Sequence, residues 1–166
     1  MEWFTADTHF HHANIIRYCD RPFESVEQMN ETMIARWNER VQRCDTVFHL
    51  GDFGFGSREG LAEIRRRLNG RIMLVIGNHD RKRDFDLFDG VSGWMRMMDP
   101  NVVLAHKPGL GVEALRTGAF SRDAVVLHGH NHGAPVNSTE ARFVDVGVDC
   151  WGFRPVSLDE VLERIK

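Results

Sequence analysis

Short apolar runs alternate with amphipathic segments along the whole chain, and this rhythm limits the fold more strongly than any other feature of the sequence. Runs of about four to eight apolar residues suit buried strands, whereas apolar positions three and four residues apart suit helices. Strands are expected at residues 2–6, 46–50, 71–76, 94–98, 102–106, 123–132 and 141–149, and helices at residues 25–41, 57–70 and 157–166. Such an alternation predicts an α/β or a layered α+β fold.

Capping and turn residues mark the ends of several of these elements. Ser25 with Gln28, and Ser157 with Glu160, have the spacing of a capping box, which closes the amino end of a helix. The Asp-Pro-Asn sequence at residues 99–101 predicts the turn of a hairpin between two strands. The first long helix carries an apolar stripe, which indicates a face packed on the core and not a cofactor site: Val26, Met29, Met33 and Trp37.

The size, charge and cysteine content of the chain exclude several classes of protein. A chain of 166 residues predicts one domain over residues 1–166, without room for a cap or lid domain. The formal net charge of −3 disfavours broad capture of nucleic acid, although a local basic patch stays compatible with it. No stretch approaches the ~20 apolar residues of a membrane span, and no secretory signal precedes the first strand. Three widely spaced cysteines without a C-x-x-C pattern indicate reduced thiols, so we expect a soluble cytoplasmic protein.

Five of the strand-like runs end in side chains that can bind a metal ion. Because open α/β sheets place their sites at the carboxyl ends of strands, this register favours one shared site. The ligands contain nitrogen and oxygen but no sulfur, which suits Mn²⁺, Fe, Zn²⁺ or Co²⁺ and disfavours Ca²⁺ and iron–sulfur clusters. Seven ligands exceed the needs of one tetrahedral ion, whereas two ions about 3.5 to 4 Å apart, as in phosphoryl transfer, would use them all. These seven residues are Asp7, His9, Asp52, Asn78, His106, His130 and His132.

The segment LHGHNHG places His128, His130 and His132 at alternate positions. In an extended segment, side chains two residues apart share one side at about 6.6 Å spacing, so His130 and His132 would both face inward. Taken alone, these two residues are compatible with three roles. They could chelate one ion together, hold one ion each of a close pair, or act as hydrogen-bonded turn residues.

In their order and spacing, five blocks over residues 3–132 resemble the signature of the metallophosphoesterases, also called calcineurin-like phosphoesterases. The signature reads D-x-H, G-D, G-N-H-D/E, an isolated histidine and G-H-x-H. Here it stands as Asp7-Thr8-His9, Gly51-Asp52, Gly77-Asn78-His79-Asp80, His106 and Gly129-His130-Asn131-His132. The segment VDVGVDCWGFRPVSLDEVL also resembles the end of small bacterial or phage-type members.

The resemblance implies a fold and a ligand set. The fold would be an α+β, four-layer α/β/β/α sandwich of two mixed β-sheets flanked by helices, forming a single catalytic domain. Two divalent ions would be bound, most readily Mn²⁺, with Fe, Zn²⁺, Co²⁺ and Ni²⁺ as alternatives. Asp52 would bridge them. One ion would be held by Asp7, His9, Asp52 and His132, and the other by Asp52, Asn78, His106 and His130.

The resemblance also implies catalytic roles. His79 would protonate the leaving oxygen or stabilise charge there, with Asp80 orienting its ring, while a metal-bound hydroxide attacks phosphorus. Asn78, His79 and His12 are candidates for substrate contact, and His12 is equally compatible with supporting the ligands. Basic residues after the site loops would meet phosphate oxygens or face solvent: Arg17, Arg21, Arg81 and Arg83. His49 is expected to be a strand residue that faces away from the site, and His128 to be a strand residue or, as a less favoured alternative, a hydrogen-bond donor that supports the ligands.

We therefore expect a metal-dependent phosphoric ester hydrolase acting on a small phosphoester or nucleotide. Little chain is left to cover the site, which favours phosphodiesters or cyclic nucleotides over monoesters. A nuclease is an alternative, and it would need a basic track built from Arg65–Arg67, Arg71 and Arg81–Arg83. A non-catalytic interaction module is disfavoured because every position of the signature is filled. The sequence leaves the oligomeric state open.

Overall fold

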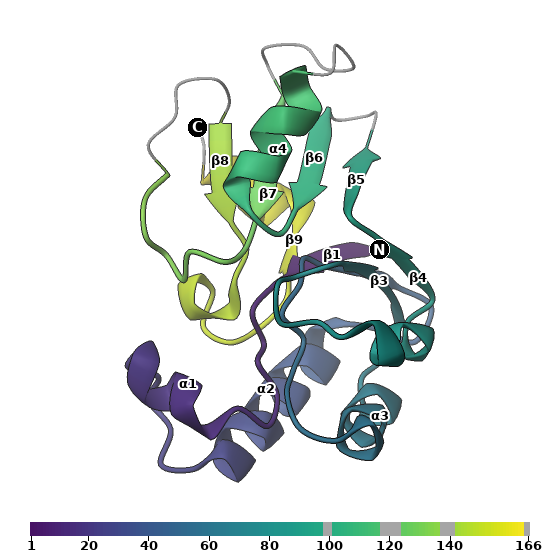
Figure 1. The fold of residues 1–166 in the computed structure, drawn as a ribbon, viewed down its shortest axis with the longest axis vertical. Helices are drawn as coiled ribbons and strands as arrows, with labels where there is room; N and C mark the ends of the chain where they lie inside the picture. The colour runs from purple at the N-terminus through teal and green to yellow at the C-terminus, as the bar shows by residue number, and fades with distance from the viewer. Residues whose placement is uncertain (98–100, 117–123, 137–141, 165–166) are drawn as a thin grey trace.

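The structure is a computed structural model that describes residues 1–97, 101–116, 124–136 and 142–164. Within these residues the strands form two sheets, both mixed (Figure 1). The first sheet has four parallel strands and one antiparallel edge strand, in the order β4 (Gly90–Ser92), β3 (Arg71–Val75), β2 (Thr46–His49), β1 (Glu2–Thr5) and β9 (Val156–Ser157). The second has an antiparallel edge strand and three parallel strands, in the order β5 (Trp94–Met97), β6 (Val102–Ala105), β7 (Val125–His128) and β8 (Arg142–Asp145).

Helices flank the two sheets, with α2 and α3 on one side of the molecule and α4 on the other (Figure 1). The side chain of Ser25 accepts a hydrogen bond from the amide of Gln28 at the start of α2, and Ser57 does the same for Gly60 in α3. Such caps satisfy amide groups that a helix start leaves unpaired. The described helices are α1 (Ala13–Tyr18), α2 (Val26–Arg40), α3 (Arg58–Arg67), α4 (Pro108–Ala114), α5 (Leu158–Glu163) and the 3-10 segments η1 (Lys82–Leu87) and η3 (Val148–Cys150).

Each sheet divides its side chains between two apolar layers, as the alternating pleat of a strand requires. In β1, Trp3 belongs to the cluster under α2 and α3, whereas Phe4 belongs to the cluster between the sheets. In β6, Leu104 joins the cluster between the sheets, whereas Val103 packs with Ala114 of α4. The layers therefore follow the order helix, sheet, sheet, helix, which confirms the predicted four-layer sandwich.

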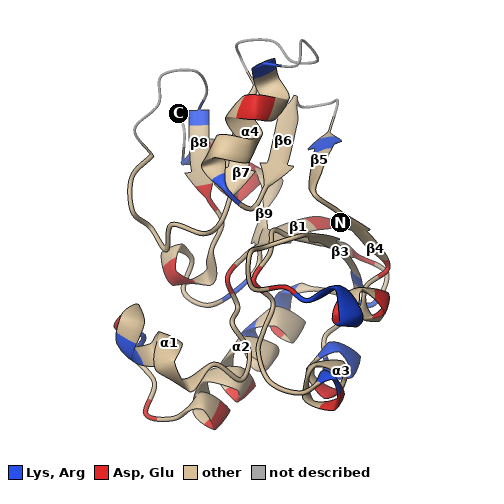
Figure 2. Ribbon diagram, viewed as in Figure 1, with Lys and Arg blue, Asp and Glu red and all other residues tan. Residues whose placement is uncertain are grey.

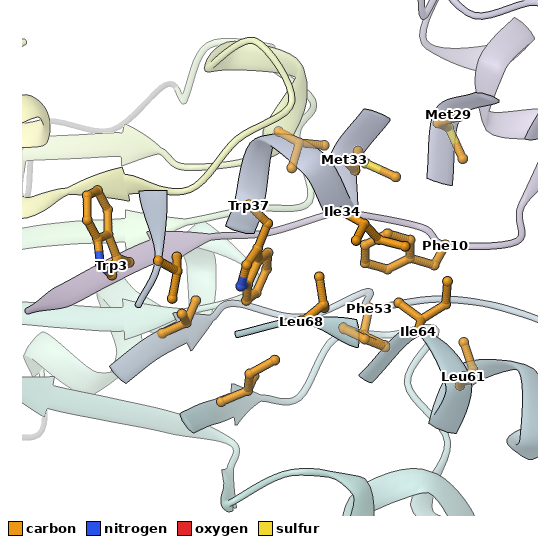
Figure 3. Close-up of a cluster of buried hydrophobic side chains, with 14 of the residues drawn as sticks. Trp3, Phe10, Met29, Met33, Ile34, Trp37, Phe53, Leu61, Ile64 and Leu68 are labelled. Carbon is orange, nitrogen blue, oxygen red and sulfur yellow. The ribbon is translucent and has the colours of Figure 1, made fainter. Parts of the chain in front are cut away.

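The predicted apolar stripe of α2 lies in the core. Met29, Met33 and Trp37 are buried, and Val26 packs at the edge of the same cluster. Figure 3 shows Met29, Met33 and Trp37 of α2 together with Ile64 of α3 in one cluster over the first sheet. Because a buried side chain of this size contributes roughly 1.5–3 kcal/mol, the cluster firmly attaches both helices to the sheet whose strand ends carry the site.

Several predicted elements are confirmed. The capping box at Ser157 and Glu160 is present with both of its hydrogen bonds. The hairpin of β5 and β6 is also present, although turn residues 99 and 100 lie outside the described residues. The box expected at Ser25 is incomplete, because the side chain of Gln28 accepts its hydrogen bond from the amide of Glu24 instead.

Two predicted strands are too long. Residues 123–132 were expected to be extended, but β7 ends at His128, and the next histidines lie in a loop. Residues 141–149 were also expected to be extended, but β8 ends at Asp145 and the 3-10 segment η3 follows. The starting residues 123 and 141 of these predictions lie outside the described part of the chain.

In the part of the chain that the structure describes, we find no helix both long and apolar enough to span a membrane. Cys19, Cys44 and Cys150 are free thiols.

Candidate metal centre

The predicted ligands of both sheets come together at the carboxyl ends of β1, β2, β6 and β7. Three groups of three residues each offer ligand atoms that lie within 4.8 Å of one another; one is Cys19, His132 and Asp149, and the other two consist of predicted ligands only. We call these the Asp7 group, which contains Asp7, His9 and His132, and the Asp52 group, which contains Asp52, His106 and His130. The structure thus divides six of the seven predicted ligands into two triads.

Asp52 lies between the two groups, and Asn78 lies beside the Asp52 group, as the predicted pair of bridged ions requires. Oδ2 of Asp52 lies 3.8 Å from Nε2 of His9 and 3.4 Å from Nε2 of His106, so this one oxygen faces both groups. Oδ1 of Asn78 lies 3.0 Å from Nε2 of His106, which adds the seventh predicted ligand to the Asp52 group. A carboxylate shared between two triads is the arrangement that a pair of bridged ions requires.

The backbone around the ligands is held in an unusual conformation. Eight non-glycine residues of the described chain have a positive φ in the left-handed region, and five of them are candidate ligands. Each such residue costs about 1–2 kcal/mol, so the conformation persists only where surrounding contacts hold it. The concentration of strained residues at one place favours a functional site. The five are Asp7 (φ 55°), His9 (φ 49°), Asp52 (φ 58°), His130 (φ 71°) and His132 (φ 47°).

Backbone amides occupy one oxygen of each acidic ligand and leave the other oxygen to the site. Oδ2 of Asp7 accepts from the amide of His130 at 2.9 Å, and Oδ1 of Asp52 accepts from the amide of His79 at 2.9 Å. Oδ1 of Asp7 is buried with no hydrogen-bond partner, and so are both ring nitrogens of His9. Because an unpaired buried polar atom is costly, a cation among these atoms would supply the missing interaction.

The ring of His106 fits the same interpretation. Its Nδ1 lies 2.7 Å from the carbonyl oxygen of Leu50 and donates to it when the ring is neutral. Its Nε2 then carries a lone pair and faces the oxygens of Asp52 and Asn78. Three acceptor atoms therefore lie close together with no hydrogen-bond donor between them. A divalent cation that prefers nitrogen and oxygen ligands could bind among them.

Burial controls the charge of the Asp7 group. Desolvation raises the pKa of Asp7 to about 7 and lowers the pKa of His9 to about 3. At Asp52 burial also favours the protonated form, but in the metal-free protein the hydrogen bond and charge of a protonated His106 outweigh it and bring the pKa of Asp52 below its ordinary value. A bound cation would favour the ionised aspartates and the neutral histidines, which are the forms that bind metal.

Asp80 does not have the role that was expected. Its Oδ2 accepts from the amides of Asp52 at 2.9 Å and Gly77 at 2.7 Å, and its Oδ1 accepts from the amide of Phe53 at 2.9 Å. The hydrogen bonds of Asp80 in the described chain go to these backbone amides and none goes to the ring of His79, so the interpretation that Asp80 orients that ring has no support in the structure. Asp80 instead joins the two loops that follow β2 and β3. His79 itself is exposed, with its ring centroid 5.8 Å from that of His9.

Arg21 is another correction. It was a candidate for phosphate contact, but it is only 4% exposed and its guanidinium binds Asp149 through two hydrogen bonds of 2.8 and 2.9 Å. Oδ2 of Asp149 also lies 2.8 Å from Nδ1 of His132, and this hydrogen bond raises the pKa of His132. Arg21 therefore contacts the protein interior behind the Asp7 group.

Four aromatic rings lie beside the Asp7 group, and we call them the aromatic rim: His12, Tyr18, Phe55 and His79. The ring of His12 stacks on Phe55 with centroids 4.1 Å apart and lies 5.5 Å from His9. Tyr18, at the end of α1, is 70% exposed and meets His12 edge-on at 6.1 Å. Phe55 also lies 5.1 Å from His79. Half-buried His12 is thus placed at the edge of the site, as its candidacy for substrate contact requires.

His49 and His128 have structural contacts. His49 is fully buried, and its Nε2 lies 2.9 Å from Oγ1 of Thr8 on the α2 side of the sheet, away from the ligands. His128 is buried at the end of β7, with Nδ1 2.8 Å from the carbonyl oxygen of Gly129. Neither belongs to the two ligand groups.

The basic residues do not form a continuous charged track among the described residues. Arg65, Arg66 and Arg67 are each paired with a carboxylate, those of Asp89, Glu63 and Glu31. Figure 2 shows acidic and basic positions interspersed on α3. The exposed candidates Arg17 and Arg81 have no ion pair within the described part of the chain.

The sequence reasoning missed Tyr18, Phe55, Asp145 and Asp149. Oδ1 of Asp145 accepts from the amide of Gly147 and Oδ2 from Gly133, beside His132. A signal was present for the acidic pair, because two aspartates four residues apart interrupt an apolar run. Tyr18 and Phe55 carried no comparable signal, since single aromatic residues near a loop are common.

Comparisons with known proteins agree with this geometry. Residues 4–155 match the model of the calcineurin-like phosphoesterase superfamily domain. The chain is 34% identical to uncharacterized protein MJ1445 of Methanocaldococcus jannaschii, over 99% of this chain and 90% of that protein. It is 29% identical to the Gene 66 protein of Mycobacterium phage L5, over 98% of this chain and 93% of that protein.

A solved structure shares the fold. The protein of unknown function AQ665 from Aquifex aeolicus superposes with a TM-score of 0.78 at 22% identity, covering 100% of this chain and 99% of that one. The family model spans most of the sequence, and the matched range includes the six residues of the two ligand groups and Asn78. The chain therefore belongs to the calcineurin-like phosphoesterase superfamily.

Proposed function

We propose that this protein is a metal-dependent phosphodiesterase that binds two divalent ions and hydrolyses diesters with a nucleoside substituent. The observation that carries the proposal is the position of Asp52, whose Oδ2 faces a histidine of each ligand group at less than 4 Å. Two adjacent triads joined by one carboxylate support a pair of ions, for which Mn²⁺ suits the mixed nitrogen and oxygen ligands.

The residues of the chain divide the chemical work. Bound ions would supply a nucleophile from water at neutral pH and neutralise charge on the phosphoryl oxygens. His79 is exposed and lies beside His9, so its ring is accessible to a substrate bound at the metal centre. There its imidazole would donate a proton to the leaving oxygen. Asp80 supports this role indirectly, because it fastens the loop that carries His79 to the loop that carries Asp52.

The aromatic rim supports a substrate with a planar group. Stacking of a base on an aromatic side chain contributes about 1–3 kcal/mol, whichever base is present. His12, Phe55 and exposed Tyr18 extend from the ligand His9 toward solvent, so a base attached to the bound phosphate would meet them. A small monoester would leave this surface unused. Ion pairs of Arg65, Arg66 and Arg67 weigh against a nuclease that follows a long strand.

A substrate panel tests the proposal. The Mn²⁺-loaded protein should hydrolyse linear nucleotide diesters or 2′,3′- or 3′,5′-cyclic nucleotides with a higher kcat/KM than matched nucleotide monoesters. Higher kcat/KM on monoesters would establish a phosphatase, and strong, salt-sensitive retention of DNA would support the nuclease alternative. No hydrolysis of any ester would contradict catalysis. The three free cysteines support an assay under the reducing conditions of a cytoplasm, where we propose the protein acts.

Two substrates with one leaving group isolate the aromatic rim. Thymidine 5′-(p-nitrophenyl phosphate) and ethyl p-nitrophenyl phosphate differ only in the group that stays on phosphorus. Tyr18→Ala should lower kcat/KM for the thymidine ester about 5- to 100-fold, as loss of one stacking contact implies, and should leave the ethyl ester nearly unchanged. Tyr18→Phe keeps the ring and should behave as the wild type. An equal loss on both esters would contradict stacking at Tyr18.

A further inference from the structure

Arg21 and Asp149 are 128 residues apart in the sequence and form a buried ion pair behind the Asp7 group. The Arg21 side chain is fully buried, and the Asp149 side chain is 10% exposed. An arginine has five N–H donors, and all five find an acceptor here. The acceptors are Oδ1 and Oδ2 of Asp149, the carbonyl oxygens of Asp7 and Thr8, and Sδ of Met29.

The acceptors of Arg21 show what the pair holds in place. Nη2 donates to the carbonyl oxygen of Asp7 at 2.7 Å, and Nη1 donates to that of Thr8 at 3.1 Å. These two carbonyls lie between Asp7 and His9, both of which have left-handed φ values that require external support. Arg21 thus fixes the loop that presents two members of the Asp7 group.

Asp149 holds the third member. Its Oδ2 accepts from Nδ1 of His132 at 2.8 Å, which keeps the proton of a neutral ring on Nδ1 and leaves Nε2 with a lone pair. The same carboxylate is clamped by Nε and Nη2 of Arg21. The fork geometry of the guanidinium is needed for this double contact, and a lysine cannot reproduce it.

The Asp52 group is supported differently. His106 donates to the carbonyl oxygen of Leu50, and the amides around Asp52 bind Asp80. No hydrogen bond or ion pair joins Arg21 or Asp149 to Asp52, His106 or His130 within the described residues. The pair of Arg21 and Asp149 therefore contacts the Asp7 group directly, whereas the hydrogen bonds that join the two groups to each other in the described chain come from backbone amides, such as that of His130 to Asp7.

We propose that Arg21 and Asp149 are positioning residues that selectively set the metal affinity of the Asp7 group. The inference rests on the metal centre of the proposed function, but not on which ester is hydrolysed. Loss of a partner that orients a metal-binding histidine typically weakens metal binding about 10- to 100-fold. Changes at this pair should therefore weaken one of the two ion sites and spare the other.

The chain offers a matched control. Arg40 and Glu160 are 120 residues apart and also pair through two hydrogen bonds, of 3.0 and 2.7 Å, but they link α2 to α5 and contact no ligand. Arg21→Lys and Arg40→Lys each replace a forked cation in a long-range pair. Asp149→Asn is a second variant at the site, which keeps the side-chain size and removes its charge.

Binding of Mn²⁺ to metal-free protein is measured by calorimetry, and electron paramagnetic resonance shows whether two ions are spin-coupled. The wild type and Arg40→Lys should bind two coupled ions. Arg21→Lys and Asp149→Asn should bind one ion with near wild-type affinity and the second about 10- to 100-fold more weakly, with an uncoupled signal near one equivalent. Melting of each metal-free variant shows whether it is folded, and Asp149→Asn decides the matter if Arg21→Lys does not fold.

A second readout needs neither metal nor substrate. In alkaline buffer, ¹⁵N shifts of His132 in the metal-free wild type should report the proton on Nδ1, and Asp149→Asn should shift this tautomer balance toward Nε2. The inference is overturned if Arg21→Lys and Arg40→Lys bind Mn²⁺ alike, if both ion sites weaken equally, or if the His132 tautomer is unchanged in Asp149→Asn. A wild type that binds two ions but hydrolyses no ester would contradict only the proposed function.

Discussion

Oδ2 of Asp52 lies 3.4 Å from Nε2 of His106, while Oδ1 of the same carboxylate accepts the amide of His79. One oxygen therefore holds the loop that carries His79, and the other faces the histidines of the two ligand groups. Asp52→Asn replaces one of these oxygens with an amide NH₂ group and should reduce bound Mn²⁺ from two ions to one or none and abolish turnover. His128→Asn, which alters a histidine outside both ligand groups, should retain both ions. Elemental analysis beside a rate assay makes the comparison, and equal effects of the two changes would contradict the bridging role.

His79 separates acid catalysis from metal binding. It is exposed and belongs to neither ligand group, so His79→Ala should retain both ions while turnover on nucleotide diesters falls by ~10² to 10⁴. A p-nitrophenolate leaving group needs little protonation, so activity on activated aryl esters should fall far less. Bound metal and both rates are measured on the same preparation. Loss of metal, or equal losses on both esters, would show that His79 is a ligand or only positions the substrate.

Gly51 is required by the close approach of two loops. Its φ is 93°, and a Cβ there would lie 2.6 Å from Cα of Gly77 and 2.6 Å from Nδ1 of His106. Gly51→Ala should therefore lower the free energy of unfolding by about 1–3 kcal/mol and displace His106. Gly93→Ala is the control, because a Cβ at that position meets nothing within 4 Å. Urea unfolding of both variants tests this, and a Gly51→Ala protein as stable as the control would refute the packing described.

Buried His49 should make the metal-free protein sensitive to acid. Burial lowers the pKa of His49 from 6.5 to about 3. Below pH 6.5 the unfolded chain therefore binds a proton at His49, whereas the folded chain does not. The contribution of neutral His49 to the free energy of unfolding is fully present above pH 6.5. It is lost as the pH falls toward 3, at up to about 1.4 kcal/mol per pH unit. His49→Gln can keep a contact with Thr8 and should flatten the loss between pH 6.5 and 4 in urea titrations. Parallel curves for the variant and the wild type would contradict this assignment.

Local patterns were sufficient for much of the fold. Seven of the nine described strands and the helices α2, α3 and α5 have strong periodicity or caps, and all of these were predicted. The strands β4 and β9 were not predicted, because runs of three and two residues are too short to show an alternating pattern. The short elements α1 and α4 were not predicted, because six or seven residues carry too little periodicity and neither helix has a side-chain cap. The extended conformation expected after His128 is wrong, because the loop needs left-handed residues that no apolar pattern can reveal.

In the candidate site, too, local patterns predict some features and miss others. That the seven candidate ligands lie together could be predicted, because each follows a strand and parallel strands bring their carboxyl ends together. The residues that support those ligands could not be predicted. Arg21 and Asp149 form an ion pair although they are 128 residues apart in the sequence, and Asp80 binds backbone amides of another loop. Contacts of this kind depend on tertiary packing and leave no spacing in the sequence.

The central claim is that two ions act together in this centre. It is tested most directly by adding Mn²⁺ to the metal-free protein, at a protein concentration far above the dissociation constants, while following hydrolysis of a nucleotide diester. The rate should stay low through the first equivalent, rise through the second and become constant at two ions per chain. A rate that reaches its maximum at one equivalent, or that does not depend on added metal, would contradict the two-metal account.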